Sequence, residues 1–417
     1  MNRTAADFDL HKPSKRAAVF VSGAMTPASR TPNTPPAEIP SAAFADTKPH
    51  YELLDGLRGV AALAVIWYHV FEGFATSPFD QRFNHGYLAV DFFFILSGFV
   101  VGYAYDDRWR QRRLSFGGFV KRRLIRLHPM VVLGAVLGAV TFCVQGSVQW
   151  DGTHVAFSLV LLSLVLHLFL IPALPGAGCE VRGNGEMYPL NGPTWSLFFE
   201  YIGNLCYALF LRRLPTRWLA AFVSLTGLGL AVFAVGNGSG YGHLGVGWSL
   251  SDWNLPGGLL RLLFAFPMGL LLSRVFRPVK IRGAFWICGA LIVALLGMPY
   301  IGDSATLWTN GLYDTLCVVV LFPLIVWLGA SGHATDRATS RVCKFLGDIS
   351  YPVYVVHYPF MYLFFAWLWS GEPIPFTRAW PVAAGLFVSC IVLAYAALKC
   401  YDEPLRRFLA RRFLTRR

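Results

Sequence analysis

Long apolar stretches separated by short polar loops constrain the fold of this chain more than any other feature. A helix needs about 20 apolar residues to cross roughly 30 Å of hydrocarbon, and about ten stretches of that length occur here. Hydrophobic residues make up 55% of the sequence and charged residues 14%, whereas a soluble domain carries about 25% charged residues. The sequence therefore predicts an all-α, polytopic membrane helix bundle. The expected spans are residues 55–75, 86–105, 126–146, 193–211, 217–236, 257–276, 283–301, 307–330, 349–369 and 381–400.

Loops rich in lysine and arginine set the expected orientation of these spans, because such residues concentrate on the cytoplasmic side of membrane proteins. The basic segments, all expected in the cytoplasm, are residues 106–126, 212–217, 274–282, 333–344 and the C-terminal tail. One further apolar stretch, 154–172, cannot cross the bilayer without moving a basic loop to the other side. We expect a re-entrant or interfacial segment there. The alternative is eleven spans with one basic loop on the wrong side.

Composition divides the chain into three parts. Residues 1–50 are rich in Ala, Pro, Ser and Thr, and are expected to be a disordered cytoplasmic extension. Residues 51–410 form the expected transmembrane domain, and residues 411–417 a basic cytoplasmic tail. The net charge of +13 comes mainly from loops and this tail, which fits an integral protein of the lipid bilayer better than one that binds nucleic acid. The scattered cysteines show no metal-ligand spacing, so neither a disulfide nor a metal site is expected.

Three ionisable residues lie within the first two spans: Arg58, His69 and Asp91. Each costs roughly 2.5 kcal/mol or more at membrane depth, so a partner or a water-filled cavity is expected. Arg58 and His69 are eleven residues apart, which places them on one helix face about 16 Å apart along the axis. Histidine suits general-base chemistry at neutral pH. The alternative is that Arg58 extends to the headgroups and His69 only hydrogen-bonds a neighbouring helix.

Five motifs occur in order along the chain: LDGLRGVAALAVIWYH, GYLAVDFFFILSGF, KRRLIRLHP, NGPTWSLFFE and SYPVYVVHYPF. Together they resemble the signatures of the acyltransferase-3 family of integral membrane O-acyltransferases. The resemblance implies transfer of an acyl group, usually acetyl from acetyl-CoA, to a hydroxyl of a carbohydrate or glycoconjugate. It also implies a location in the bacterial inner membrane. The basic loops and the count of ten spans place both termini in the cytoplasm.

The family's Arg-x10-His pattern falls on Arg58 and His69, and we expect His69 to be the general base. Its Arg-x-x-Arg pattern falls on Arg123 and Arg126, one helical turn apart, where paired guanidinium groups suit the phosphates of coenzyme A. The alternative is that these two arginines are ordinary residues of a cytoplasmic loop. His357 resembles the family's second histidine and is expected on the donor side, near the thioester.

Two carboxylates, Asp91 and Glu200, are predicted near the outer ends of their spans and complete the expected catalytic set. Either could orient His69 or bind acceptor hydroxyls, or could instead cap a helix or pair with a buried cation. The residues expected to bind the acceptor are Ser97, Asn191, Trp195 and Ser196.

The sequence contains no Gly-x-Ser-x-Gly elbow, which favours direct transfer over a serine acyl-enzyme. The competing class is a transporter or flippase of a polar or glycolipid substrate, because intramembrane Arg, His and Asp also suit proton-coupled transport. Several acceptors fit the resemblance, including surface polysaccharides and signalling oligosaccharides.

Overall fold

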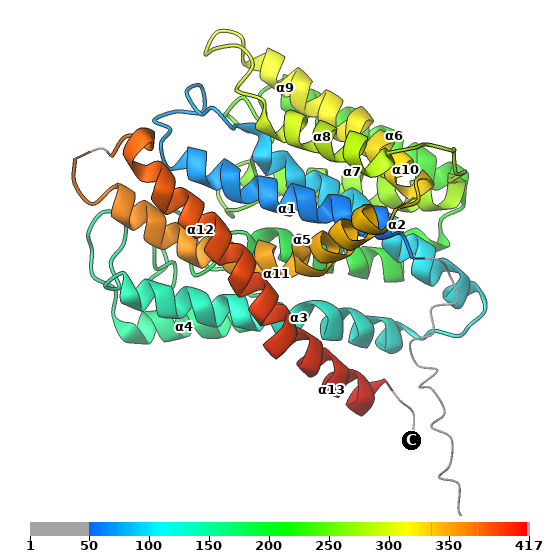
Figure 1. Cartoon of the computed structure of the whole chain (residues 1–417), viewed down its shortest axis with the longest axis horizontal. Helices are drawn as coiled ribbons and strands as arrows, with labels where there is room; N and C mark the ends of the chain where they lie inside the picture. The colour runs from blue at the N-terminus through cyan, green and yellow to red at the C-terminus, as the bar shows by residue number, and fades with distance from the viewer. Residues whose placement is uncertain (1–49, 335, 373, 415–417) are drawn as a thin grey trace, which may run out of the picture. The chain divides into compact units, whose positions relative to one another are not determined.

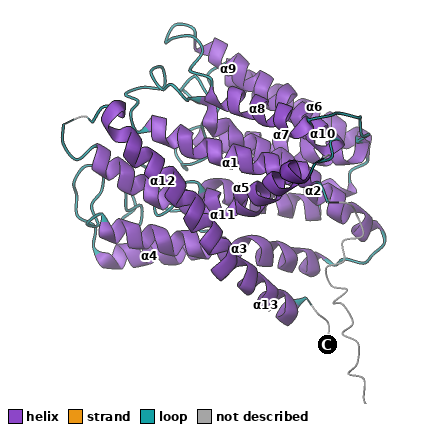
Figure 2. Cartoon of the chain, viewed as in Figure 1, coloured by secondary structure: helices purple, strands orange, loops and turns teal. Residues whose placement is uncertain are grey.

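The computed structural model describes residues 50–334, 336–372 and 374–414. These residues form a bundle of thirteen α-helices, and no β-strand occurs among them (Figure 1, Figure 2). The predicted all-α class is confirmed. Apart from His50, the predicted disordered extension lies outside the described residues. Of the predicted basic tail, Arg411 to Phe413 continue the last helix, and residues 415–417 lie outside the described part.

Seven helical segments are long and apolar enough to cross a membrane, so the chain is a polytopic integral membrane protein. They are α1 (Glu52–Glu72), α2 (Ala89–Arg110), α3 (Phe116–Val144), α6 (Thr216–Val235), α7 (Asn254–Val275), α9 (Leu307–Leu316) continued by α10 (Phe322–Ser331), and α12 (Phe376–Ala397) continued by α13 (Glu403–Phe413). The other three predicted spans correspond to α5 (Thr194–Leu209), α8 (Ala284–Gly297) and α11 (Arg337–Leu368). Since α5 and α8 are short and the first half of α11 is charged, the count of ten spans stays a prediction.

The ambiguous apolar stretch forms α4 (Phe157–Leu168), a helix of 12 residues. Its length of about 18 Å is too short to cross the hydrocarbon alone. Helix α4 lies beside α3 (Figure 1) and ends where Leu168 meets His128, close to the middle of α3. The imidazole Nε2 of His167 lies 3.1 Å from Thr194 Oγ1 at the start of α5. This geometry favours the predicted re-entrant segment over an eleventh span.

Two helices begin well before their predicted spans. Helix α3 begins at Phe116, where Ser115 Oγ accepts a hydrogen bond from the Gly118 N–H, and α11 begins at Arg337, where Asp336 accepts from the Thr339 N–H. Hydropathy marks only the apolar part of a helix, whereas these capping side chains start it further upstream in charged sequence. Arginines expected in a loop before α3 therefore lie within the helix.

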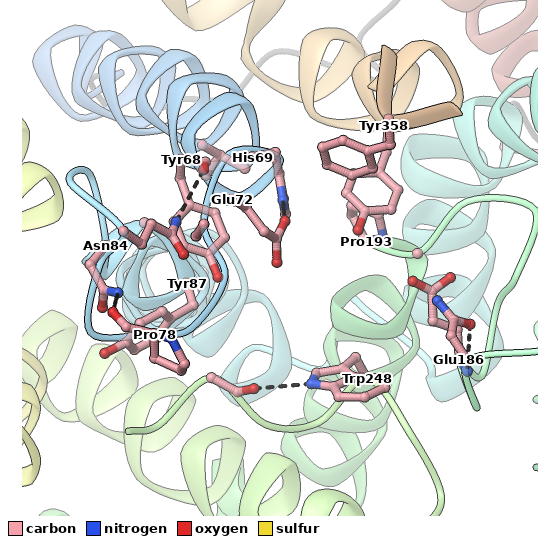
Figure 3. Close-up of a pocket in the computed structure, with 18 of the residues that line it drawn as sticks. Tyr68, His69, Glu72, Pro78, Asn84, Tyr87, Glu186, Pro193, Trp248 and Tyr358 are labelled. Atoms are coloured by element: carbon pink, nitrogen blue, oxygen red, sulfur yellow. Dashed lines mark hydrogen bonds and ion pairs between the residues drawn. The ribbon is translucent and has the colours of Figure 1, made fainter. Parts of the chain in front are cut away.

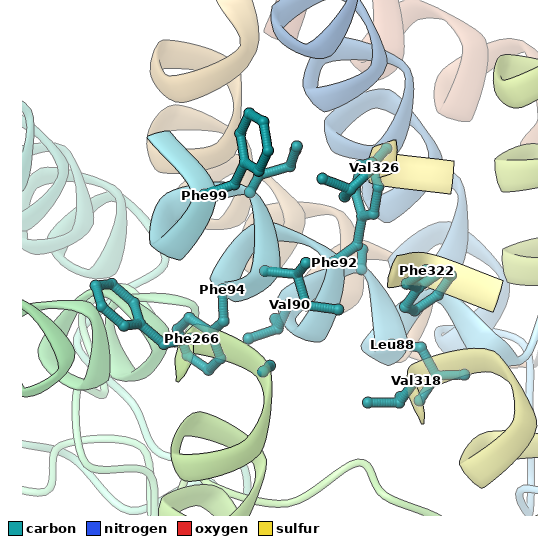
Figure 4. Close-up of a cluster of buried hydrophobic side chains, with 14 of the residues drawn as sticks. Leu88, Val90, Phe92, Phe94, Phe99, Phe266, Val318, Phe322 and Val326 are labelled. Atoms are coloured by element: carbon teal, nitrogen blue, oxygen red, sulfur yellow. The ribbon is translucent and has the colours of Figure 1, made fainter. Parts of the chain in front are cut away.

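Close backbone contacts hold the bundle together. Helix α1 packs most extensively on α11 and α2 on α7. A Cβ at Gly59 would come within 2.4 Å of the Leu346 carbonyl oxygen, so only glycine allows α1 and α11 to approach this closely. Figure 4 shows the apolar core around α2, where the rings of Phe92 and Phe94 pack among side chains from α7 and α10.

Candidate active site

Three cavities follow one another along α1, and each is named here by its contents. The histidine cavity, of about 570 Å³, lies at the Glu72 end of α1 and contains His69. The middle cavity, of about 110 Å³, is lined by Arg123 and Glu200. The arginine cavity, of about 370 Å³, lies at the Asp55 end of α1. Neighbouring cavities share lining residues: Val90 and Tyr354 join the first two, and Arg58, Arg126 and Tyr351 join the last two.

His69 sits near the end of α1 with its imidazole turned toward the histidine cavity (Figure 3). Its Nδ1 lies 2.6 Å from Glu72 Oε2, three residues further along the same helix. A carboxylate accepts at this distance, so in the neutral imidazole Nδ1 carries the proton and Nε2 is the acceptor. The histidine side chain is 14% exposed and the glutamate 40% exposed, so the pair is reachable from the cavity. A histidine held in this way is able to act as a general base.

The His357 ring stacks beside His69, with a centroid separation of 5.6 Å. It is fully buried, its Nδ1 faces the Val353 carbonyl at 3.1 Å, and its Nε2 has no hydrogen-bond partner. The structure therefore brings His357 to His69, and its expected place near the thioester stays a prediction.

Glu200 lies in the middle cavity and is not near His69. Its Oε1 accepts hydrogen bonds from Arg123 Nη2 at 2.7 Å and from Ser97 Oγ at 2.8 Å. The structure thus brings together three residues that were predicted to have different roles: Arg123 in the donor site, Glu200 in catalysis and Ser97 in acceptor binding. The Nε of Arg123 is buried and has no hydrogen-bond partner, so this cluster keeps a free cationic donor.

Arg58 lies toward the opposite end of α1 from His69, as the eleven-residue spacing predicts. It lines the middle and arginine cavities, whereas His69 lines the histidine cavity. Its Nη2 lies 2.9 Å from Asp55 Oδ1, and its Nε donates to Ser350 Oγ at 2.8 Å. Arg58 and Arg126 both line the middle and arginine cavities. Further cations from other helices, Lys344 and Arg406, line the arginine cavity. Five carboxylates line it as well, and three of them form ion pairs with these cations: Asp55 with Arg58, Asp348 with Lys344 and Asp402 with Arg406.

Asp91 is fully buried and paired with Arg261 of α7, at 2.7 Å between Nη2 and Oδ2. It is not among the described residues that line the three cavities. Arg261 also donates to the carbonyl oxygens of Val246 and Tyr87. Of the four roles considered for Asp91, the structure matches pairing with a buried cation, and the ion pair supports the wall of the histidine cavity.

The predicted acceptor residues separate in the structure. Trp195 lines the histidine cavity. Asn191 is buried and donates to the Val355 carbonyl at 2.9 Å, and the Ser196 hydroxyl lies 2.7 Å from the Tyr354 hydroxyl. Asn191 and Ser196 therefore tie the segment before α5, and α5 itself, to α11.

Sequence reasoning missed Glu72 and Arg261. The signal for Glu72 was its position three residues after His69 on a helix, which puts both side chains on one face. The signal for Arg261 was a single arginine inside an otherwise apolar span, which needs a buried counter-charge.

The basic side chains of the arginine cavity can bind the phosphates of an acyl donor where phosphate oxygens replace the carboxylates that pair with them. Guanidinium groups bind phosphate oxygens bidentately, and the arginine cavity gathers Arg58, Arg126, Lys344 and Arg406. Among the described residues, no group of three or more His, Cys, Asp or Glu side chains is placed to hold a metal ion. The eight cysteines, all within the described ranges, are unpaired.

Comparison with known proteins identifies the family. The family model described as "Acyltransferase domain" matches residues 51–399. "Protein 2 in picA locus" of Rhizobium radiobacter is 37% identical over 190 residues, which are 44% of this chain and 90% of that protein. Acyltransferase MdmB of Streptomyces mycarofaciens is 25% identical over 86% of this chain and 92% of its own length.

A third relative is the exopolysaccharide production protein ExoZ of Rhizobium meliloti (strain 1021), 27% identical over 81% of this chain and 95% of its own length. No solved structure matches the chain. The family match spans most of the transmembrane bundle, including His69 and all three cavities' α1 residues. The chain therefore belongs to the acyltransferase-3 family and is a membrane acyltransferase that transfers groups other than aminoacyl groups.

Proposed function

We propose that this enzyme transfers an acyl group, acetyl in the simplest case, from acyl-CoA to a hydroxyl of a carbohydrate or glycoconjugate. The observation that carries the proposal is the series of three adjoining cavities along α1, with four cations at one end and the His69–Glu72 pair at the other. The exopolysaccharide production protein among the relatives supports a saccharide acceptor.

Acyl-CoA would supply an activated thioester. Arg58, Arg126, Lys344 and Arg406 would bind its phosphates in the arginine cavity. The clustering of basic loops near this end of the bundle supports a cytoplasmic donor site and both termini in the cytoplasm. The bacterial relatives support a location in the bacterial inner membrane. The middle cavity is narrow, and Arg58, Arg123 and Glu200 line it. It would hold part of the extended arm that joins the phosphates to the reacting carbonyl.

The chemistry would take place in the histidine cavity. His69 Nε2 would accept the proton of the acceptor hydroxyl while Glu72 holds the ring through Nδ1. The same nitrogen would then return the proton to the departing thiolate, so that the proton balance closes within the site. No serine nucleophile is needed. We propose Asp91 and Arg261 as structural supports of this cavity, and Glu200 as a positioning group for Arg123.

The test measures CoA release and acyl transfer by the purified protein in lipid nanodiscs, with acetyl-CoA and the surface glycans of cells that lack the gene. His69→Ala is expected to lower kcat by about 10²- to 10⁴-fold without changing the KM for acetyl-CoA. Arg126→Ala is expected to raise that KM by about tenfold or more. Matched controls are His154→Ala and Arg217→Ala, both at exposed positions outside the three cavities.

Full activity of His69→Ala would overturn the base assignment. Equal loss of kcat in both active-site variants, with no change of KM in Arg126→Ala, would overturn the separation of donor and acceptor ends. A wild-type protein that moved glycans across vesicles and released no CoA would instead favour the transporter alternative.

A further inference from the structure

Beyond His69, aromatic rings line the histidine cavity in an unbroken series of contacts. The Tyr358 ring centroid lies 4.6 Å from His69, and the Tyr362 centroid lies 4.6 Å from Tyr358. The series continues with Trp150 at 6.1 Å from Tyr362, and with Trp369 at 5.3 Å from Trp150. All of these side chains line the one cavity. Tyr358, Tyr362, Trp150 and Trp369 are called the aromatic wall below.

The aromatic wall is held in place from behind by Arg182, which is fully buried. The guanidinium carbon of Arg182 lies 3.4 Å from the Tyr362 ring centroid and 5.3 Å from that of Trp150. Its Nε donates to the Pro189 carbonyl and its Nη1 to Gln145 Oε1. Further along, Trp369 Nε1 donates to the Gly73 carbonyl at 3.0 Å. The rings are therefore fixed before any ligand arrives, which lowers the entropy lost on binding.

A polar edge accompanies this apolar surface. The Glu186 side chain lines the cavity, is 7% exposed, and accepts a hydrogen bond from the Tyr362 hydroxyl. Asn184 lines the cavity beside it. Figure 3 shows Glu186 and Tyr358 on the side of the cavity that faces Glu72 and Tyr87. An aromatic face with a carboxylate and an amide at its edge matches a sugar ring, which presents C–H groups on its faces and hydroxyls around its rim.

Tryptophans near membrane ends commonly act as anchors in the headgroup layer. Trp150 and Trp369 differ from such anchors because they line a cavity and contact each other, and because Trp150 also lies over the buried Arg182. Tyr358 and Tyr362 lie between His69 and Trp150. A sugar ring stacked on Trp150 is therefore a different sugar ring from the one whose hydroxyl reaches His69.

We propose that the aromatic wall and Glu186 form a subsite for a second sugar ring, next to the ring whose hydroxyl is acylated at His69. The inference rests on the proposed function and deepens it: the acceptor is an oligosaccharide or polysaccharide, bound by at least two consecutive rings. The cavity volume of about 570 Å³ falls within the roughly 300–1,000 Å³ of sites that enclose a ligand of that size.

The experiment uses the full-length enzyme in nanodiscs with acetyl-CoA and one glycan cut to different lengths. The glycan is the surface polysaccharide of cells that lack the gene, partially hydrolysed and separated into fragments of one, two and four rings. The readout is the ratio of kcat/KM for two rings to that for one ring, which does not depend on how much of a variant folds. A second ring stacked on the aromatic wall is expected to raise wild-type kcat/KM by about threefold to tenfold.

Trp369→Ala and Trp150→Ala are expected to bring the ratio close to one. Trp369 is the milder site, because its side chain is 52% exposed. The matched control is Trp218→Ala at the start of α6, a 59% exposed tryptophan outside the cavity, which is expected to keep the wild-type ratio.

A wild-type ratio near one, or an unchanged ratio in both tryptophan variants, would overturn the subsite and leave the proposed function standing. Absence of transfer to every fragment and to the intact polysaccharide would overturn the proposed function and the subsite with it. A parallel series of alkyl monosaccharides tests the other occupant, a lipid tail. If a longer alkyl chain, and no second ring, raised kcat/KM in the wild type and lost that effect in the variants, the wall would bind lipid.

Discussion

The two ends of α1 are built from different kinds of side chain. The histidine cavity is walled by aromatic rings and supported by the fully buried Asp91–Arg261 pair. The arginine cavity is lined by charges of both signs, several of them exposed, such as Lys344 and Asp348. Bond-making requires fixed geometry, whereas loading and releasing a charged donor requires charges that can exchange partners. The difference indicates that the reacting end is preorganised and the loading end adaptable.

Asp91→Ala should have the largest effect, because it leaves Arg261 buried without a counter-charge. We expect the free energy of unfolding to fall by about 3–5 kcal/mol, measured by thermal unfolding of the protein in detergent. The control is Asp348→Ala, whose partner Lys344 is 72% exposed and whose effect should stay within about 1 kcal/mol. Similar losses in the two variants would mean that the ends of α1 do not differ in rigidity.

Glu186 should make the stability of the histidine end depend on pH. Burial raises the pKa of this loop carboxyl from 4.5 to about 7, and outweighs the Tyr362 hydrogen bond and the Arg182 charge, which lower it. Between pH 4.5 and 7 the folded protein therefore holds a proton that the unfolded chain has lost. Stability should fall as the pH rises through this window, by at most about 3 kcal/mol, and then level off.

Melting curves of the wild type and Glu186→Gln between pH 4 and 8 provide the measurement. The variant carries no ionisable group at this position, so its stability relative to the wild type should increase across the window. A constant difference between the two proteins, or one of the opposite sign, would contradict the assignment.

Glu72→Gln should have the smallest effect of the three, and it acts on catalysis. The amide cannot hold the His69 ring as a carboxylate does, so we expect kcat to fall by about 10- to 100-fold while the KM for acetyl-CoA stays constant. Glu72→Asp should recover part of the loss, and Glu372→Gln, in the exposed loop after α11, should behave like the wild type. A rise in that KM, or no recovery with aspartate, would make Glu72 a structural residue rather than a positioning one.

The fold class and the main axis of the site could be predicted from sequence. Apolar length and scarce charge identify spanning helices directly, and helical periodicity put Arg58 and His69 on one face of α1, where they now line successive cavities. The errors arose where hydropathy carries no signal. Capped, charged helix starts before residues 126 and 349 were taken for loops.

Pairings between distant helices were also beyond the reach of the sequence. Nothing local connects Asp91 with Arg261, or Glu200 with Arg123. The aromatic wall draws on two loops and on α11, and loops carry no periodicity from which to place their side chains. The resemblance to a known family supplied the chemistry of His69, and the structure added its orientation by Glu72.

The short length of α4 and α5 has a consequence for the membrane itself. Helix α4 ends midway along α3, α5 begins beside its end, and the two helices have only 12 and 16 residues. Residues 169–193, which connect α4 to α5, contribute Asn184, Glu186 and Pro193 to the histidine cavity. A polar cavity lined by non-helical backbone can exist within a membrane only where protein shields that backbone from lipid. The short helices thus leave an interior space between them, in which the proposed water-soluble acceptor would reach His69.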